Sequence, residues 1–264
     1  MIGVLQNGAM HTVDEILRAS AAWVWYPRGC EHEEEHLQLV RYPARLGGKV
    51  QASMVDSVLR PSDVIDYAIA RARAWGEHEL TFWTGAADAP SLEEELLRRG
   101  AVHDDTVTVF ARATDAEMPA FPVGVTTEIV RTADQIREVD GINAEVWEQD
   151  PLDEDGLAEE LTEIAAGLRG GKGARVLARV GGRAASTGGC TLVGGFVRLW
   201  GGATRSSARG RGAYRAVIAE RLRFGLSHGA ATAIVKGRVT TSAPILARAG
   251  FEPYGEDRKY LLRF

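Results

Sequence analysis

The sequence has little cysteine, no excess of basic residues and no long apolar run. Its 264 residues include two cysteines, Cys30 and Cys190, too few for a disulfide framework, so we expect both to remain thiols in the cytoplasm. A formal charge of −5 argues against a protein that mainly binds nucleic acid. No stretch approaches the ~18 apolar residues of a membrane span, and residues 1–12 do not resemble a secretory signal. We therefore expect neither a nucleic-acid partner nor a membrane.

The composition is that of a globular chain long enough for two domains. Hydrophobic residues make up 45% and charged residues 25%, which is typical of a protein that buries a sizeable core, and the length favours two domains of ordinary size. Residues 114–124 include Pro119 and Pro122 and separate two stretches in which helices and strands alternate. We therefore expect domains at 1–113 and 125–264 joined by a linker at 114–124. Frequent alanine, glycine and arginine suggest a bacterial gene.

Hydrophobic periodicity and capping residues predict an α/β fold with a mixed sheet in both halves. In the first half the expected elements are a helix opened by the capping box of Thr12 and Glu15, a helix capped by Ser62, a strand at 80–83, a helix from Ser91 and a strand at 107–111. In the second half they are a strand at 127–130, a helix opened by the capping box of Thr132 and Gln135, an acidic helix at 153–168, strands at 175–180, 184–192 and 196–203 with a Gly181-Gly182 hairpin turn, a helix with Tyr214, Val217, Ile218 and Leu222 on one face, a strand at 231–235, a short helix at 242–248 and a final strand pair after Gly250.

One loop in the second half has the residues of an anion site. The strand at 196–203 runs into Arg209-Gly210-Arg211-Gly212, and a helix follows at once. Backbone amides at a helix N-terminus bind phosphate well, glycine lets the backbone approach a ligand closely, and arginine adds charge. The loop has neither the Gly-Lys-Ser/Thr ending of a nucleotide P-loop nor the three glycines of a dinucleotide fingerprint. The sequence therefore predicts a phosphate site of another kind.

Taken with its surroundings, this loop resembles that of the GNAT acetyltransferases. The resemblance covers roughly residues 125–264 and includes Ala203-Thr204 before the loop and Ala249-Gly250-Phe251-Glu252-Pro253 after it. It implies the GNAT fold and an acyltransferase that uses acetyl-CoA as co-substrate. In that family the pyrophosphate of coenzyme A lies on an Arg-x-x-Gly-x-Gly/Ala loop, and the preceding strand bulges so that pantetheine can lie along it.

The resemblance also implies which residues hold the coenzyme. They are Gly202, Ala203 and Thr204 for pantetheine and the thioester, and Arg209, Gly210, Arg211, Gly212, Ala213 and Tyr214 for the pyrophosphate. A main-chain N–H at Gly202 or Ala203 would polarise the acyl carbonyl.

Two positions depart from the family pattern. Tyr214 stands where the loop normally ends in a small residue, and Leu246 stands where the family often has a tyrosine that serves as an acid. Because leucine cannot donate a proton, Ser242 becomes a candidate catalytic residue. Capping the helix that contains Pro244 is the more ordinary duty of such a serine.

The first half resembles a GNAT domain that has lost its phosphate loop. Arg60-Pro61-Ser62 stands where an arginine–glycine turn would be expected, while Phe82-Trp83-Thr84-Gly85 and residues 90–100 resemble the closing part of such a domain. We therefore expect two tandem GNAT-like domains. The copy at 125–264 would bind the coenzyme, and the degenerate copy at 1–113 would shape the acceptor pocket or an interface.

The expected reaction moves an acetyl or other short acyl group from coenzyme A to an amine of a small molecule or peptide by direct attack. Glu145 and Glu148 lie on the helix that flanks the acceptor in the family, so Glu145 acting through water is a candidate base, although a solvated helix face also explains these carboxylates. Two alternatives remain, a catalytically silent acyl-CoA-binding module and a transferase with a different acyl or aminoacyl donor. We expect a monomer or homodimer.

We expect no metal site. Cys30, His32 and His36 have a spacing that could bind a metal, but their acidic neighbours, Glu31 and residues 33–35, are more typical of a charged loop.

Overall fold

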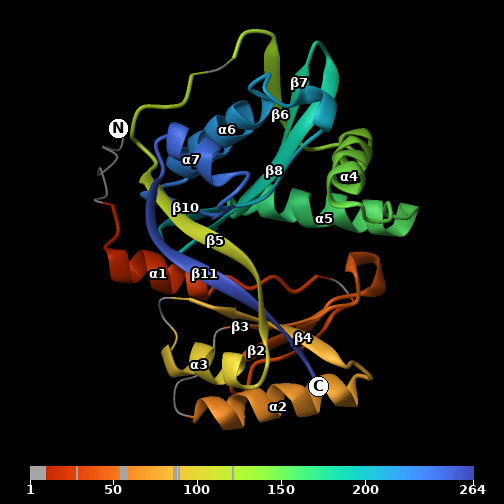
Figure 1. The fold of residues 1–264 in the computed structure, drawn as a ribbon. Helices are drawn as coiled ribbons and strands as arrows, with labels where there is room; N and C mark the ends of the chain where they lie inside the picture. The colour runs from red at the N-terminus through yellow and green to blue at the C-terminus, as the bar shows by residue number, and fades with distance from the viewer. Residues whose placement is uncertain (1–9, 28, 54–58, 86–87, 89, 121) are drawn as a thin grey trace. The chain divides into compact units, whose positions relative to one another are not determined.

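The computed structural model describes residues 10–27, 29–53, 59–85, 88, 90–120 and 122–264. They divide into two compact units, and neither unit is continuous in sequence (Figure 1). Unit 1 comprises Met1–Thr12, Phe110–Lys236 and Pro244–Glu252, and unit 2 comprises Val13–Val109, Gly237–Ala243 and Pro253–Phe264. The expected domains at 1–113 and 125–264 were uninterrupted stretches, whereas the C-terminal segment Pro253–Phe264 belongs to the same unit as Val13–Val109. None of the described helices is both long and apolar enough to cross a membrane.

Unit 2 is a sheet with two helices packed against it. Its elements are α1 (Val13–Ala21), β1 (Glu31–Glu33), β2 (Gln38–Arg41), η1 (Ala44–Leu46), β3 (Val50–Ser53), α2 (Pro61–Ala74), β4 (Glu79–Thr84), α3 (Pro90–Arg98), the greater part of β5 (Val102–Ala113) and nearly all of β11 (Glu252–Arg263). The strands lie in the order β1-β2-β3-β4-β11. The β3–β4 pair is parallel and the other three are antiparallel, so the sheet is mixed.

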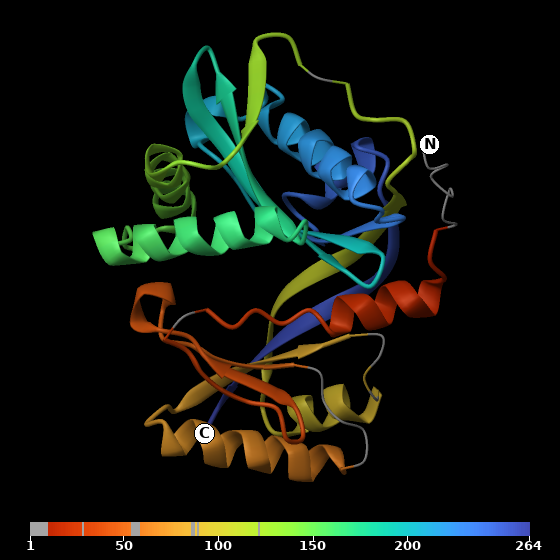
Figure 2. The same ribbon diagram turned by 180° about the vertical axis from the view of Figure 1, so that it is seen from behind.

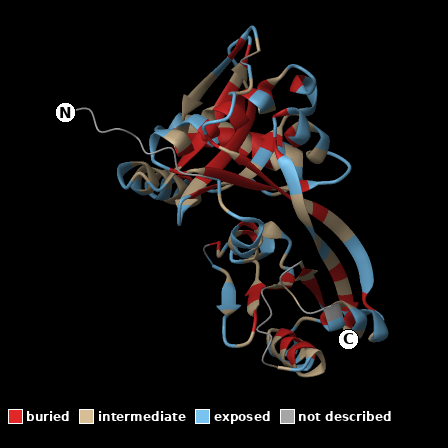
Figure 3. Cartoon of the chain, turned by 90° about the vertical axis from the view of Figure 1, so that its left-hand side faces the viewer, coloured by how far each residue is buried: buried red, intermediate tan, exposed pale blue. Residues whose placement is uncertain are grey.

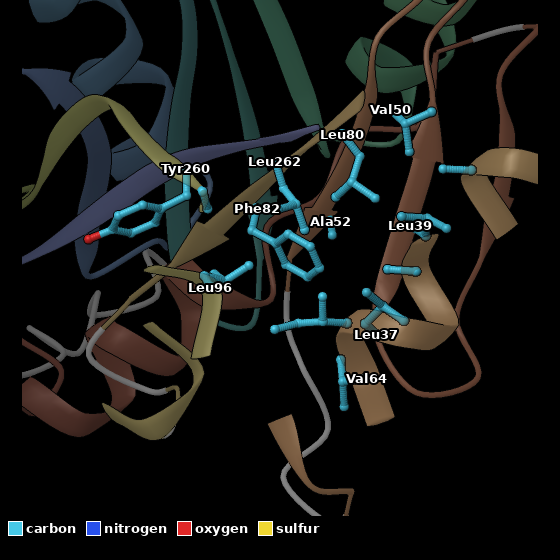
Figure 4. Packing of buried hydrophobic residues seen from close by; sticks show 14 of the residues in the cluster. Leu37, Leu39, Val50, Ala52, Val64, Leu80, Phe82, Leu96, Tyr260 and Leu262 are labelled. Carbon is cyan, nitrogen blue, oxygen red and sulfur yellow. The ribbon is translucent and has the colours of Figure 1, made fainter. Parts of the chain in front are cut away.

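The core of unit 2 lies between the sheet and helices α2 and α3. Every third or fourth residue of α2 is buried, as the helical period requires, and meets strand residues such as Phe82 and Leu262 (Figure 4). Helix α2 begins differently from the expectation, because its N-cap is Arg60 and Pro61 occupies the first turn. Proline fits there, since its missing N–H would have no partner in any case. The prediction that Ser62 caps this helix was therefore wrong.

In unit 1, helices cover both faces of the strands. Its elements are β6 (Val125–Ile129), α4 (Ala133–Trp147), α5 (Glu154–Arg169), β7 (Gly173–Val180), β8 (Arg183–Val193), β9 (Phe196–Thr204), η2 (Ser206–Ala208), α6 (Ala213–Ser227), most of β10 (Thr232–Arg238) and most of α7 (Ala243–Arg248). The strands lie in the order β10-β9-β8-β7-β6, with a parallel β9–β10 pair and antiparallel pairs elsewhere.

Helices α6 on one side and α4 with α5 on the other enclose this sheet (Figures 1 and 2). Val176 packs in one cluster with residues of α6 such as Val217, and its neighbour Leu177 packs in another with residues of α4 such as Ile142. The two differ because successive strand residues point to opposite faces. Both faces are therefore apolar, and the buried residues concentrate on the strands (Figure 3).

Two local predictions for unit 1 are confirmed. Thr132 caps α4, its side chain accepting a hydrogen bond from the Gln135 amide while the Gln135 side chain accepts from the Thr132 amide. Gly181 and Gly182, both with positive φ, form the two-residue turn between β7 and β8, as expected for the primed turns of hairpins.

Candidate functional site

The glycine-bearing loop leads from β9 through η2 into α6. Gly210 and Gly212 have φ values of 75° and 81°, which lie in the left-handed region that glycine enters without strain. Gly212 is the N-cap of α6 and offers no side-chain cap to its first amides. Those amides are oriented toward the loop, at the positive end of the helix dipole.

Two exposed arginines flank this helix N-terminus. Arg209 and Arg211 are exposed, and neither forms a salt bridge with any residue in the described part of the chain. Their charge adds to that of the helix dipole, so the loop can accept an anion such as phosphate.

The strand before the loop contains a β-bulge. Thr187 of β8 pairs with Ala203 of β9, but Gly189 pairs with Trp200, so two residues of β9, Gly201 and Gly202, lie opposite Gly188 alone. Gly201 has a φ of 57°, as the extra residue of such a bulge often does. The bulge that the family resemblance implied is therefore present.

The same strand loses its other neighbour at this point. The parallel pairing of β9 with β10 runs from Phe196–Thr232 to Leu199–Val235, while β9 continues to Thr204. Within the described residues, the β10-side edge of β9 from Trp200 onward thus has no strand partner. An extended ligand could pair with backbone groups of this edge.

The two glycines of the bulge open toward opposite faces of the sheet. A Cβ built on Gly202 would lie 2.6 Å from the Tyr214 ring, on the α6 side. A Cβ built on Gly201 would lie 3.0 Å from Nη1 of Arg175 and 3.7 Å from the Trp147 ring, on the α4 side. Tyr214, which replaces the small residue of the family loop, therefore lies against the backbone of Gly202.

Two buried arginines beneath the bulge were missed by the sequence reasoning. Arg221 of α6 is fully buried and donates to the carbonyl oxygens of Gly189 and Trp200, both at 3.2 Å. Arg175 of β7 is 3% exposed and donates to Thr187 Oγ1 and Asn143 Oδ1. The sequence pattern did indicate that both arginines point inward. Arg221 follows Val217 by four residues on the buried stripe of α6, and Arg175 lies two residues before the buried Leu177, on the same face of β7.

Glu145, near the end of α4, contacts the segment that follows β9. Its carboxylate forms an ion pair with Arg205 and accepts a hydrogen bond from the Ser206 amide at 3.3 Å. The side chain is 39% exposed. These contacts place a carboxylate beside the entry to the loop, whereas the sequence alone favoured a solvated helix face.

Ser242 lies in unit 2, just before α7, and its hydroxyl accepts a hydrogen bond from the Arg238 amide at 2.9 Å. This bond closes the turn between β10 and α7, a side-chain–backbone bond typical of serine in turns. Leu246, at the position of the family tyrosine, is fully buried in α7.

We expect Ser242→Ala to affect stability more than chemistry. Loss of the bond to Arg238 should lower the free energy of unfolding by ~1 kcal/mol, a shift of a few degrees in the melting temperature. Melting temperature and turnover at saturating coenzyme, measured on the same variant, check this. A ~100-fold loss of turnover without a thermal shift would instead identify Ser242 as a proton donor.

The N-terminus of α2, the counterpart of the loop in the first half, is already neutralised. Asp63 accepts two hydrogen bonds from the Arg60 guanidinium, at 2.8 and 2.9 Å, and the Arg60 guanidinium lowers the pKa of Asp63. A carboxylate in the first turn takes the place that an anionic ligand would need.

The residues whose spacing suggested a metal do not form a cluster. Cys30 Sγ lies 4.0 Å from His32 Nδ1, while His36 lies beside Glu35 and Tyr67. Glu31, expected in a charged loop, begins β1. Within the described ranges, no group of three or more His, Cys, Asp or Glu side chains could hold a metal ion.

Comparison with known proteins identifies the fold. No family model and no curated protein matches the chain. Among solved structures, it is similar to a GCN5-related N-acetyltransferase from Kribbella flavida, with 18% identity, a TM-score of 0.67, and coverage of 98% of this chain and 96% of that chain. The chain has the GNAT fold. A GCN5-related N-acetyltransferase from Sphaerobacter thermophilus is also similar, at 16% identity and a TM-score of 0.64 over 95% of this chain and 85% of that chain.

A tandem GNAT protein from the clavulanic acid biosynthesis pathway is similar over almost the whole chain. It shares 14% identity and a TM-score of 0.67, with coverage of 95% of this chain and 93% of that chain. The GNAT fold and the resemblance to tandem GNAT proteins, expected from the loop and from the degenerate first half, are thus confirmed.

Proposed function

We propose that the protein is an acyltransferase that moves an acetyl or other short acyl group from coenzyme A to an amine. The observation that carries the proposal is the basic glycine loop at the N-terminus of α6, directly after a bulged strand that loses its partner. The GNAT fold of its structural neighbours, which are named acetyltransferases, supports the same reaction class.

The residues at the loop fit a diphosphate. Arg209 and Arg211 supply two positive charges, Gly210 and Gly212 leave the backbone accessible, and the amides from Ala213 onward face the anion. Tyr214 lies beside the first of the residues proposed for pantetheine, Gly202, Ala203 and Thr204.

The chemistry at the bulge needs a donor for the developing negative charge. We assign this to the N–H of Gly202 or Ala203, because a fixed donor at the position where charge develops stabilises the transition state. Thiolate departure needs less help than alkoxide departure, since a thiol has a pKa of ~8.5. An acid at Leu246 is therefore dispensable, and Ser242 remains only a candidate.

The neutral amine must be generated on the protein before attack. Glu145, held beside the loop by Arg205 and Ser206, is the carboxylate we propose to accept this proton through a water molecule. The acceptor would be a small molecule or a peptide with an accessible amine.

Calorimetry with acetyl-CoA, followed by a thiol-release assay over a panel of amines, tests the proposal. We expect binding and turnover of at least one acceptor. Binding without turnover of any amine would favour a catalytically silent acyl-CoA-binding module. Absence of binding would contradict both the coenzyme A-dependent acyltransferase and the silent acyl-CoA-binding module. It would leave a transferase with a different acyl or aminoacyl donor.

We expect Gly212→Asp to weaken coenzyme A binding at least tenfold, about 1.4 kcal/mol, because it places a negative charge among the amides of α6. The structure adds a steric effect, since a Cβ at Gly212 would lie 2.4 Å from Pro122 Cγ. Gly212→Ala is the matched control, as it shares the positive φ and this contact but adds no charge. Titration of both folded variants checks the prediction, and unchanged affinity in Gly212→Asp would refute the loop assignment.

A further inference from the structure

Arg175 is a buried cation that forms no salt bridge with any residue in the part of the chain that the structure describes, and Glu160 on α5 acts on it only through space. Its two hydrogen bonds go to neutral oxygens, Thr187 Oγ1 at 3.0 Å and Asn143 Oδ1 at 3.2 Å, and its guanidinium lies 5.0 Å from the centre of the Trp200 ring. A charge moved out of water costs several kcal/mol, and Glu160 offsets only a part of this cost, since burial has the larger effect on Arg175. An anionic ligand group at this place would offset that cost.

Electrostatic effects on Arg175 agree with this description. Burial lowers the pKa of Arg175 to about 10. The negative charge of Glu160 on α5 opposes this effect by raising the pKa, and the positive charge of Arg221 lowers it further. Arginine with this pKa is still protonated at neutral pH, so the buried group keeps its charge.

The remaining nitrogen of Arg175 is directed at the bulge. Nη1 makes no hydrogen bond with the described residues and lies 3.0 Å from the place of a Cβ on Gly201. Glycine at 201 therefore leaves this N–H group next to bare backbone, and the Trp147 ring lies 3.7 Å from the same place.

This side of the bulge is opposite to the one beside the phosphate loop. Gly202 opens toward Tyr214 on α6, whereas Gly201 opens toward residues packed with α4. If the coenzyme occupies the α6 side, as the proposed function requires, the acceptor amine approaches from the α4 side. Arg175 then lies where the acceptor meets the thioester.

We propose that the acceptor is an amine that also carries a carboxylate, and that Arg175 binds this carboxylate. The inference rests on the proposed function and names the substrate class of the same site. A single buried guanidinium balances the single charge of a carboxylate, and charge-assisted hydrogen bonds of this kind are among the strongest in proteins. Asn143 and Thr187 fix the orientation of the guanidinium, which makes Arg175 a specificity-determining residue.

The experiment compares free α-amino acids with their α-amides, which keep the amine and side chain but lack the negative charge. Thiol release at saturating acetyl-CoA gives kcat/KM for each pair with the wild type, Arg175→Met and Arg175→Lys. Arg183→Met, which changes an exposed arginine of the neighbouring strand β8, is the matched control. Melting temperature and coenzyme affinity are measured for every variant.

We expect the wild type to prefer acids to amides at least tenfold. In Arg175→Met, kcat/KM should fall at least tenfold for acids and less than threefold for amides. Arg175→Lys should retain part of the preference for acids. Arg183→Met should change kcat/KM for neither acids nor amides. Coenzyme affinity should be unchanged, and removal of a buried charge that forms no salt bridge with the described residues should leave the protein folded.

Several results would overturn the inference. One is an equal loss on acids and amides in Arg175→Met, which would indicate a structural role or stabilisation of the oxyanion. Others are a wild type that turns over amides as well as acids, or that binds coenzyme but acetylates no amino acid. Those results leave the proposed function standing, whereas a wild type that does not bind coenzyme A removes both. If Arg175→Met fails to fold, the wild-type preference and the lysine variant decide.

Discussion

Glu145→Gln is expected to lower turnover about 100-fold at neutral pH, the lower end of the usual contribution of a general base. Glutamine keeps an oxygen that can accept from the Ser206 amide, as Glu145 does at 3.3 Å. It cannot accept the proton that the amine acceptor must lose. The variant therefore removes the proposed chemistry while it retains one of the contacts that hold the turn after β9.

The pH dependence and one control variant separate catalysis from positioning. Without a base, the rate should follow the fraction of neutral amine, so the deficit of Glu145→Gln should shrink as the pH approaches the pKa of the acceptor. Arg205→Met removes the ion pair but keeps the carboxylate. An equal loss in Arg205→Met, or a deficit that does not change with pH, would show that Glu145 only positions the turn.

Phe82→Ala is expected to lower the free energy of unfolding by ~3–5 kcal/mol, the usual range for removal of a buried phenylalanine. Phe82 on β4 is fully buried, pairs with Tyr260 across the β4–β11 ladder, and lies among leucines of the unit 2 core (Figure 4). The large cavity would be surrounded by a sheet on one side and two helices on the other, which limits its collapse. Urea denaturation measures the change.

Leu97→Ala provides the matched control on α3. Leu97 is 50% exposed, so its truncation should change the free energy of unfolding by no more than ~0.5 kcal/mol. Coenzyme affinity of the folded Phe82→Ala protein should equal that of the wild type, because the proposed coenzyme residues belong to unit 1. A cost below ~1 kcal/mol for Phe82→Ala would contradict the packing, and a selective loss of coenzyme affinity would contradict the assignment of binding to unit 1.

Local patterns in the sequence predicted the elements whose stability is itself local. The capping box of Thr132 and Gln135, the Gly181-Gly182 turn and the helix after Gly212 all depend on residues within a few positions of each other. Strands β1, β2 and β3 were missed, because their pairing and burial depend on neighbours that no short window contains. The prediction of a final strand pair after Gly250 was wrong, because this segment forms one strand, β11. Its pairing with β4 could not be derived from either segment.

The candidate site divides in the same way. The phosphate loop could be predicted because its function resides in consecutive backbone groups between Arg209 and Ala213. Arg175, Asn143 and Gly201 come from three elements, and only the folded sheet brings them together. The pattern did indicate that Arg175 points inward, but it could not indicate that both of its hydrogen-bond partners are neutral.

The pairing of β4 with β11 fixes the order in which the protein can be completed during synthesis. The Thr84 hydroxyl donates a hydrogen bond to the carbonyl oxygen of Arg258, 174 positions later in the sequence. The first half of the chain therefore emerges from the ribosome long before the strand that pairs with β4. Until then β4 is an open edge, and Tyr260 and Leu262 are absent from the core. An exposed edge of this kind recruits other strands. The nascent first half is therefore the stage at which we expect dependence on chaperones, and a chain truncated after Glu252 should aggregate during expression.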